Sequence, residues 1–303
     1  MNELLELSKK TADFNIRNFL EVLALLDGSK KVMRLSLHDN SEPIIRMHIE
    51  RLGLNWVRSK FRQKTSFTSN LGDSYTESVS FSSSGDLPFT VMVSFDQNAA
   101  CSALEMEEET GDFDSLGIML GYPSCCVKSY GKIKDGNDWL KVALSNTPIS
   151  NAYEPAVNKL SYLFSGMTLF YDYFPCSFNC IETATISTKI GALLKNAGFC
   201  NLYETVYMEM TYPIILLDGM LIQLRNAVYD KFDSSLKYDL SLSRQWIWVL
   251  CSGIEDNVFW GSDFLRFSNE WLEFYCGKKF LGRVFQGEFQ RLLLFRSMKN
   301  NCL

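Results

Sequence analysis

Two close pairs of cysteines are the residues of this sequence whose types and spacing best fit chemistry. Cys125 and Cys126 are adjacent, and Cys176 and Cys180 are separated by three residues. The chain has nine cysteines, an odd number, and no sign of export, so a disulfide framework is not expected. Metal binding, catalysis or plain burial must then explain the thiols, and burial is the ordinary explanation for the isolated cysteines.

Both pairs are predicted to lie at the start of a helix. Ser124 follows a Gly and a Pro, and it is a good N-cap that would place the first pair in the first helical turn. Either Ser177 or Asn179 can cap the next helix, with Cys180 in or beside its first turn and Cys176 just ahead. The free N–H groups and the dipole of a helix N-terminus stabilise thiolates, the form that binds metals and attacks electrophiles. We therefore expect one thiolate-rich site.

Four sulfur ligands suit two kinds of metal group. Zinc accepts four thiolates, but its structural sites more often use two short Cys-x2–4-Cys pairs, and adjacent cysteines are awkward around one tetrahedral ion. A 4Fe–4S cluster has separate irons that can take neighbouring thiolates, so the spacing favours this cluster, with zinc as the alternative. Two further alternatives are a low-pKa cysteine nucleophile with a resolving partner, and four buried thiols without a ligand. The two histidines, His38 and His48, do not favour a histidine-rich site.

With these motifs, the chain resembles an uncharacterised prokaryotic family catalogued as domain of unknown function 483. Its members carry a Leu-Gly-Tyr-Pro-x-Cys-Cys-Val element, which matches residues 120–127, and a later Pro-Cys-Ser-x-x-Cys element, which matches residues 175–180. The resemblance covers about residues 110–200 and not the flanking thirds. It implies that the four cysteines act as one unit. The family brings no established reaction, so the resemblance does not say what that unit does.

Three side chains near the cysteines could supply acid–base or substrate-anchoring groups. Lys128 and Tyr130 follow the first pair on its expected helix, and Glu182 lies two residues past Cys180. If the helix starts converge, these groups lie beside the site, and we predict them as catalytic residues. The alternatives are a solvated surface and, for Glu182, a carboxylate favoured by the helix dipole. The chain has no Gly-rich nucleotide-binding motif, no Gly-x-Ser-x-Gly and no Cys-x3-Cys-x2-Cys.

These residues predict a metal-dependent cytoplasmic enzyme that uses the four cysteines for redox or sulfur-related chemistry on a small molecule or a peptide. A non-catalytic, metal-stabilised protein-binding module is one alternative, and a metal-free thiol enzyme is another. The net charge of −5 argues against a nucleic-acid partner, and the basic residues between Arg51 and Lys64 are interpreted as a solvated face. No stretch approaches the roughly 20 apolar residues of a membrane span, and the N-terminus lacks a signal-peptide pattern, so no membrane association is expected.

The elements around this site predict an α+β fold. A helical cysteine-bearing middle, residues 111–200, is expected between two α+β parts, residues 1–110 and 201–303. In the middle part, apolar residues at helical spacing predict helices over 157–167 and 186–197, with the second cysteine pair between them.

The N-terminal part is predicted to begin with a helix over residues 3–27, which ends at an Asp-Gly stop signal. A strand over 32–37 and a helix over 41–52 follow. Residues 74–96 alternate as strands do and predict a hairpin, while the acidic run at 105–109 is interpreted as a solvated helix face or linker.

In the C-terminal part, two apolar runs predict a second hairpin. Residues 214–217 and 221–224 flank Asp218-Gly219, a dipeptide that suits the tight turn between paired strands.

Overall fold

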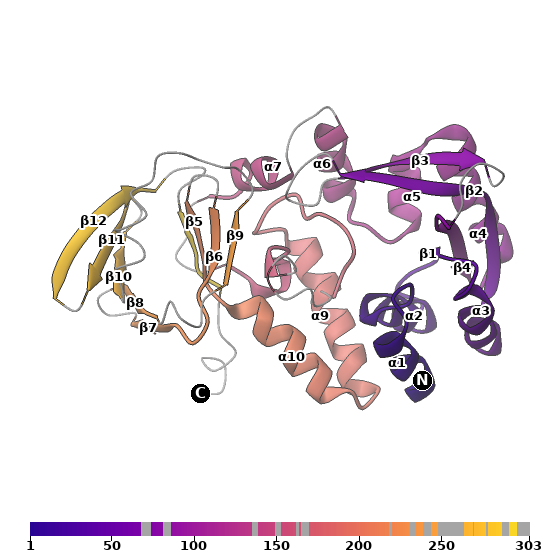
Figure 1. Cartoon of the computed structure of the whole chain (residues 1–303), viewed down its shortest axis with the longest axis horizontal. Helices are drawn as coiled ribbons and strands as arrows, with labels where there is room; N and C mark the ends of the chain where they lie inside the picture. Colours follow the sequence, from indigo (N-terminus) through magenta and orange to yellow (C-terminus); the bar gives the residue numbers. More distant parts are fainter. Residues whose placement is uncertain are drawn as a thin grey trace.

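The computed structural model has an α+β fold, as the sequence predicts. It describes residues 1–67, 74–80, 86–134, 139–148, 153–161, 164, 170–217, 220–230, 234–238, 244–247, 264–268, 270–276, 278–286 and 291–295. Among these residues the strands form three antiparallel sheets, and most of the helices lie in the first two thirds of the chain. Figure 1 shows the first sheet and its helices at one end, the two later sheets at the other end, and the helices of the middle third between them.

The first sheet has the strand order β1–β4–β2–β3. Its strands are β1 (Met33–Leu37), β2 (Asn55–Phe67), β3 (Ser74–Ser80) and β4 (Phe89–Ser94). The strand predicted over 32–37 is confirmed as β1. The predicted hairpin is wrong, because β3 pairs with β2, whereas β4 lies between β1 and β2. The alternation of apolar residues identifies a strand but does not identify its partner.

Strand β2 occupies the basic segment that the sequence suggested to be a solvated face. Its arginines lie against carboxylates: Arg58 bonds to Asp39 at 2.8 Å, and Arg62, which is 6% exposed, pairs with the same carboxylate. The Arg58 guanidinium also lies 3.8 Å from the centre of the Phe89 ring. The interpretation as a solvated face is therefore wrong for Arg58 and Arg62, whose charges are paired, whereas Arg51 and Lys60 are exposed as expected.

The N-terminal helix is divided in two, α1 (Asn2–Lys10) and α2 (Ile16–Leu26), so the prediction of one helix over 3–27 is wrong. The division arises because Asn15 and Asn18 form a capping box, in which each side chain accepts a hydrogen bond from the backbone N–H of the other. The predicted stop is confirmed: α2 ends just before Gly28, which has φ +74.

The helix predicted over 41–52 is confirmed as α3 (Glu42–Arg51), and the acidic run follows α4 (Gln97–Glu105) as a π-helical turn. The solvated interpretation of that run is wrong for Glu107, whose side chain is 13% exposed. The Glu107 carboxylate accepts hydrogen bonds from the Arg34 guanidinium at 2.7–3.1 Å and from the Gln63 amide at 2.9 Å. Glu107 therefore attaches the end of α4 to the first sheet.

Replacing Glu107 with Ala is expected to lower the free energy of unfolding by about 2 kcal/mol. Breaking a fully buried ion pair costs roughly 3–5 kcal/mol, and Arg34 is one-third exposed, so that water compensates part of the loss. Denaturant titration of the variant measures this change. Glu109→Ala is the matched control from the same acidic run, because Glu109 is exposed. Equal stability of the two variants would contradict the role of Glu107.

The middle third of the chain is helical. Its α-helices are α5 (Phe113–Met119), α6 (Ser124–Lys134), α7 (Trp139–Ser145), α9 (Ile181–Asn196) and α10 (Cys200–Thr211). The helix predicted over 186–197 is confirmed as the larger part of α9. The helix predicted over 157–167 is wrong at its start, since residues 155–157 form a single 3-10 turn that begins at Pro155. Residues 162, 163 and 165–167 of that prediction lie outside the described residues.

Two sheets form the C-terminal third. One has the order β13–β5–β6–β9 and contains β5 (Ile214–Leu217), β6 (Met220–Gln223), β9 (Arg244–Ile247) and β13 (Arg291–Leu293). The other has the order β12–β11–β10–β8–β7 and contains β7 (Val228–Asp230), β8 (Ser235–Lys237), β10 (Phe264–Phe267), β11 (Trp271–Cys276) and β12 (Lys279–Phe285). The second predicted hairpin is confirmed by the pairing of β5 with β6, and its Asp-Gly turn lies outside the described residues.

The largest apolar core draws residues from all three predicted parts of the chain. It contains Leu35 of β1, Phe178 of the middle third and Leu216 of β5, each fully buried. Cys126 and Cys180 belong to the same core. The predicted boundaries near residues 110 and 200 stay predictions. Within the described ranges, every helix falls short of the length and apolar character that a membrane crossing requires.

Candidate metal centre

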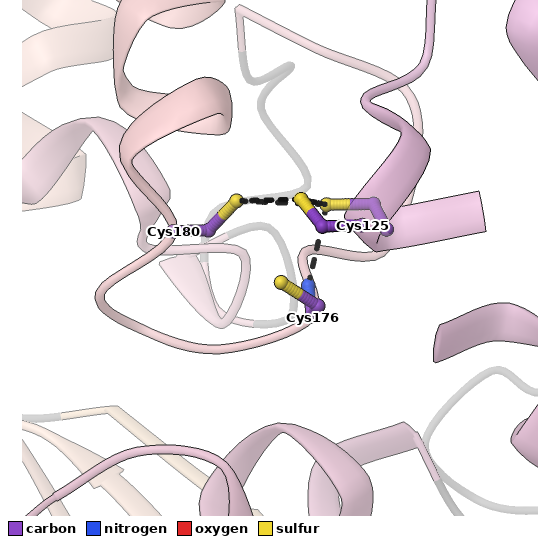
Figure 2. A group of neighbouring side chains, drawn as sticks. Cys125, Cys176 and Cys180 are labelled. Carbon is purple, nitrogen blue, oxygen red and sulfur yellow. Dashed lines mark hydrogen bonds between the residues drawn. The ribbon is translucent and has the colours of Figure 1, made fainter. Parts of the chain in front are cut away.

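The structure brings the four predicted cysteines together. Their sulfur atoms all lie within 4.8 Å of one another. The Sγ of Cys180 is 3.7 Å from those of both Cys125 and Cys126, and the two adjacent sulfurs are 3.9 Å apart. Figure 2 shows Cys125 on α6, Cys180 at the start of α9 and Cys176 on the loop ahead of it, with their sulfurs turned towards a common point. Such a set of four thiols can hold a metal ion.

The first pair is positioned by the start of α6. The carbonyl of Pro123 accepts hydrogen bonds from the N–H groups of Cys126 and Val127, both at 2.9 Å, so both cysteines lie in the first turn as predicted. The predicted cap is wrong by one residue, because Ser124 is the first helical residue. Gly117 lets α5 approach this turn closely, since a Cβ there would lie 2.9 Å from a methyl of Val127.

The second pair is positioned by a cysteine that caps its own helix. Cys180 is the N-cap of α9, and its sulfur accepts a hydrogen bond from the backbone N–H of Thr183 at 3.5 Å. The prediction of Ser177 or Asn179 as the cap is therefore wrong. A thiolate fills the same role as the usual cap oxygen, because it accepts from the orphan N–H groups of the first turn.

The loop that carries Cys176 is fixed by α7 and the residues that come after it. The Trp139 indole N–H donates to the carbonyl of Pro175 at 3.2 Å, and the Asn146 amide donates to the carbonyl of Cys176 at 3.1 Å. In turn, the backbone N–H of Cys176 donates to the Sγ of Cys126 at 3.4 Å. These bonds hold the loop against the start of α6.

Thr183 is a residue that the sequence prediction missed. It is fully buried, and its hydroxyl donates to the Sγ of Cys180 at 3.2 Å and lies 3.4 Å from the Sγ of Cys126. Its place three residues after Cys180 is the N3 position of α9, which is the signal that could have identified it. Donors of this kind orient sulfur ligands and stabilise their negative charge.

Hydrogen bonds within the cluster shift the pKa values of the four thiols in opposite directions. The pKa of Cys180 lies far below the usual thiol value, because Cys126, Cys176 and Thr183 donate hydrogen bonds to its sulfur. Hydrogen bonding with Cys176 and Cys180 raises the pKa of Cys126, and burial raises the pKa of Cys125 to about 12. For Cys176, a hydrogen bond from Cys126 lowers the pKa, but bonding to Cys180 and burial raise it overall. Four thiolates together therefore need a cation.

The three predicted catalytic residues all have exposed side chains. Lys128 on α6 and Glu182 in the first turn of α9 are both exposed to solvent. Tyr130 lines an apolar cavity of about 210 Å³ that also reaches Cys126. Their catalytic roles stay predictions. Two further residues lie near the sulfurs without having been predicted: Tyr171 and Tyr173 are buried, and the charge of the cysteines raises the pKa of Tyr171 after the larger effect of burial.

Comparisons with known proteins identify no relative. No family model, no curated protein and no solved structure matches this chain. The resemblance to the family catalogued as domain of unknown function 483 therefore stays a prediction, and the function is inferred from the geometry of the four cysteines.

Proposed function

We propose that the four cysteines bind a single zinc ion, and that this ion has a structural role in a metal-stabilised binding module. The observation that carries the proposal is the spacing of the sulfur atoms. With zinc–sulfur bonds of about 2.3 Å, the corners of a tetrahedral site lie about 3.8 Å apart. The sulfur–sulfur distances of 3.7 and 3.9 Å in the cluster agree with that value.

The same distances are less suited to a 4Fe–4S cluster. In such a cluster each cysteine binds a different iron, so that its sulfur lies outside a cube of iron and sulfide and well away from the other three. Four sulfurs within 4.8 Å of one another leave room between them for one ion. The sulfur spacing therefore favours zinc, although adjacency in the sequence favoured the larger cluster.

The structural role follows from the number and burial of the ligands. Four protein thiolates fill every position of a tetrahedral zinc ion, whereas catalytic zinc keeps one position open for water or substrate. Cys126 and Cys180 are 2% and 5% exposed. Since α6 supplies one pair and the start of α9 the other, the ion would join two helices that are about fifty residues apart in the sequence.

Catalysis at the centre is the second candidate. Its supporting observation is that the apolar cavity of about 210 Å³ is lined by Cys126 together with Tyr130, so a small molecule could reach one sulfur. Metal-bound thiolates and a metal-free Cys180 thiolate are both nucleophiles. Redox or sulfur-related chemistry would then use Cys126 or Cys180 rather than an open metal position.

The test is purification of the full chain without oxygen, followed by analysis of zinc, iron and sulfide. We expect one zinc ion per chain, negligible iron and sulfide, and no absorption near 400 nm, because zinc has no redox or d-electron transitions. Stoichiometric iron with sulfide and a brown colour would overturn zinc in favour of a 4Fe–4S cluster. Absence of either metal, together with a thiol that is rapidly alkylated, would instead support a metal-free thiol enzyme.

A further inference from the structure

A cavity with charged side chains in its wall, the charged cavity, has a volume of about 250 Å³ and lies beside the metal centre, and none of the four cysteines lines it. Helices α2 and α9, residues 120–122 and residues 170–173 enclose the cavity. Charged side chains of both signs line it: Arg17, Glu21, Lys30, Asp172 and Lys189.

Four of these charges form two ion pairs within the cavity wall. Lys30 pairs with Glu21, and their side chains are 8% and 12% exposed. The Arg17 guanidinium lies 2.9 Å from the Asp172 carboxylate, and both are more accessible, at 37% and 23%. Burial of charge is costly, and partly buried ion pairs occur in functional sites as well as in structural networks. The more accessible pair is the one that a ligand can reach.

Aromatic residues form another wall of the cavity. Tyr171 and Tyr173 are 4% and 7% exposed. Their hydroxyl oxygens are fully buried, so the two residues line the cavity with other atoms. Phe170 and Tyr122 complete this wall.

The apolar cavity that reaches Cys126 adjoins the charged cavity. The two share Leu120, Tyr122, Asp172 and Tyr173 as lining residues. Apart from Asp172, the apolar cavity is lined by aliphatic and aromatic side chains such as Leu116, Val127 and Phe174, together with Cys126. Together the two volumes fall within the roughly 300–1,000 Å³ that is typical of ligand pockets. Asp172 therefore stands where a charged cavity meets an apolar one.

We infer that the two cavities bind a free α-amino acid with an apolar side chain. The ligand carboxylate would form an ion pair with Arg17, and the ligand ammonium group would form an ion pair with Asp172. Since Asp172 lines both cavities, an ammonium group bound there places the adjoining side chain in the apolar cavity. Of the four proposed metal ligands, only Cys126 lines this site.

The inference is tested by calorimetric titration of the zinc-loaded full chain with L-leucine. We expect binding in the millimolar range or tighter. Leucinamide, which lacks the carboxylate, and 4-methylpentanoate, which lacks the ammonium group, should each bind at least about tenfold more weakly, since each loses a charged hydrogen bond. Glycine should also bind at least about tenfold more weakly, because it buries no side chain. Equal binding of leucine and its analogues, or no binding of leucine, would overturn the inference.

Two variants locate the site. Arg17→Gln and Asp172→Asn should each weaken leucine binding by at least about tenfold. Arg46→Gln is the matched control, because Arg46 makes an exposed ion pair with Glu50 at 2.7 Å on α3 and should leave binding unchanged. Unchanged binding in both cavity variants would contradict the assignment. All three variants should keep their zinc, so failure of the ligand inference is distinguishable from failure of the metal proposal.

Discussion

Replacing Cys126 with Ser is expected to remove the zinc ion proposed for this site and to lower the free energy of unfolding by at least about 3 kcal/mol. Cys126 is 2% exposed, and its sulfur contacts those of Cys125 and Cys180. Serine has no thiolate, so only three sulfur ligands remain in a site that is still buried. For a chain of this size, such a loss lowers the midpoint of thermal unfolding by roughly 5 °C or more. Metal analysis and thermal denaturation of the same sample measure both effects.

A second cysteine provides the matched control for this experiment. Cys200 is exposed at the start of α10, so Cys200→Ser should keep its zinc and its stability. A strong chelator should bring the wild-type midpoint down to that of Cys126→Ser and leave the variant unchanged, because the two treatments remove the same ion. Stoichiometric zinc in Cys126→Ser would show that this residue is not a ligand.

Each half of the site could be predicted from the sequence because the position of each cysteine pair at a helix start is local. A helix that starts at a Gly-Pro break places Cys125 and Cys126 in its first turn, whichever residue forms the cap. The prediction of the caps failed for a related reason. Ser and Asn are the usual caps, and Cys180 takes that place only because its sulfur is also turned towards three other sulfurs, which a local pattern does not reveal.

The contacts between distant segments could not be predicted. Alternating apolar residues identified β3 and β4 as strands, but both pair with β2, which the sequence presented only as a basic segment. Likewise, an acidic run of similar residues contains one carboxylate, Glu107, that meets Arg34. The choice between zinc and a 4Fe–4S cluster also depends on distances across about fifty residues of chain. Periodicity specifies a buried face, and tertiary packing selects its partner.

The isolated cysteines illustrate the same limit. Burial is the statistical expectation for a free cysteine, but Cys101, Cys200 and Cys276 are exposed. Each lies on a helix or strand at a position that faces solvent. The buried residues of the same element determine which of its faces is exposed. The paired cysteines differ because their spacing, rather than their residue type alone, indicated a shared site.

Replacing Phe178 with Ala is expected to lower the free energy of unfolding by roughly 3–5 kcal/mol. Phe178 lies in the loop between Cys176 and Cys180 and is fully buried. Its ring packs against Trp139 and Phe295, with centroids 6.2 and 6.4 Å away. Truncation leaves a cavity under the loop that carries half of the sulfur ligands. Denaturant unfolding with zinc in excess measures the loss.

The control for this loss is an exposed phenylalanine. Phe95 is 52% exposed, so Phe95→Ala should change the free energy of unfolding by no more than about 0.5 kcal/mol. A loss below about 1 kcal/mol in Phe178→Ala would mean that the loop collapses onto the cavity or is held by the metal alone.

Combining Phe178→Ala with Cys126→Ser tests whether the aromatic anchor and the metal hold the same loop. Phe178 fixes the loop from the side of α7, through its ring and through an N–H that donates to Thr147 at 2.8 Å. The zinc ion would fix the ends of the same loop. Once the ion is gone, the loop is less ordered and the ring has less packing to lose. The double variant should therefore be more stable than the sum of the single losses predicts, by roughly 0.5–3 kcal/mol. Simple additivity would show that metal and ring stabilise separate parts of the fold.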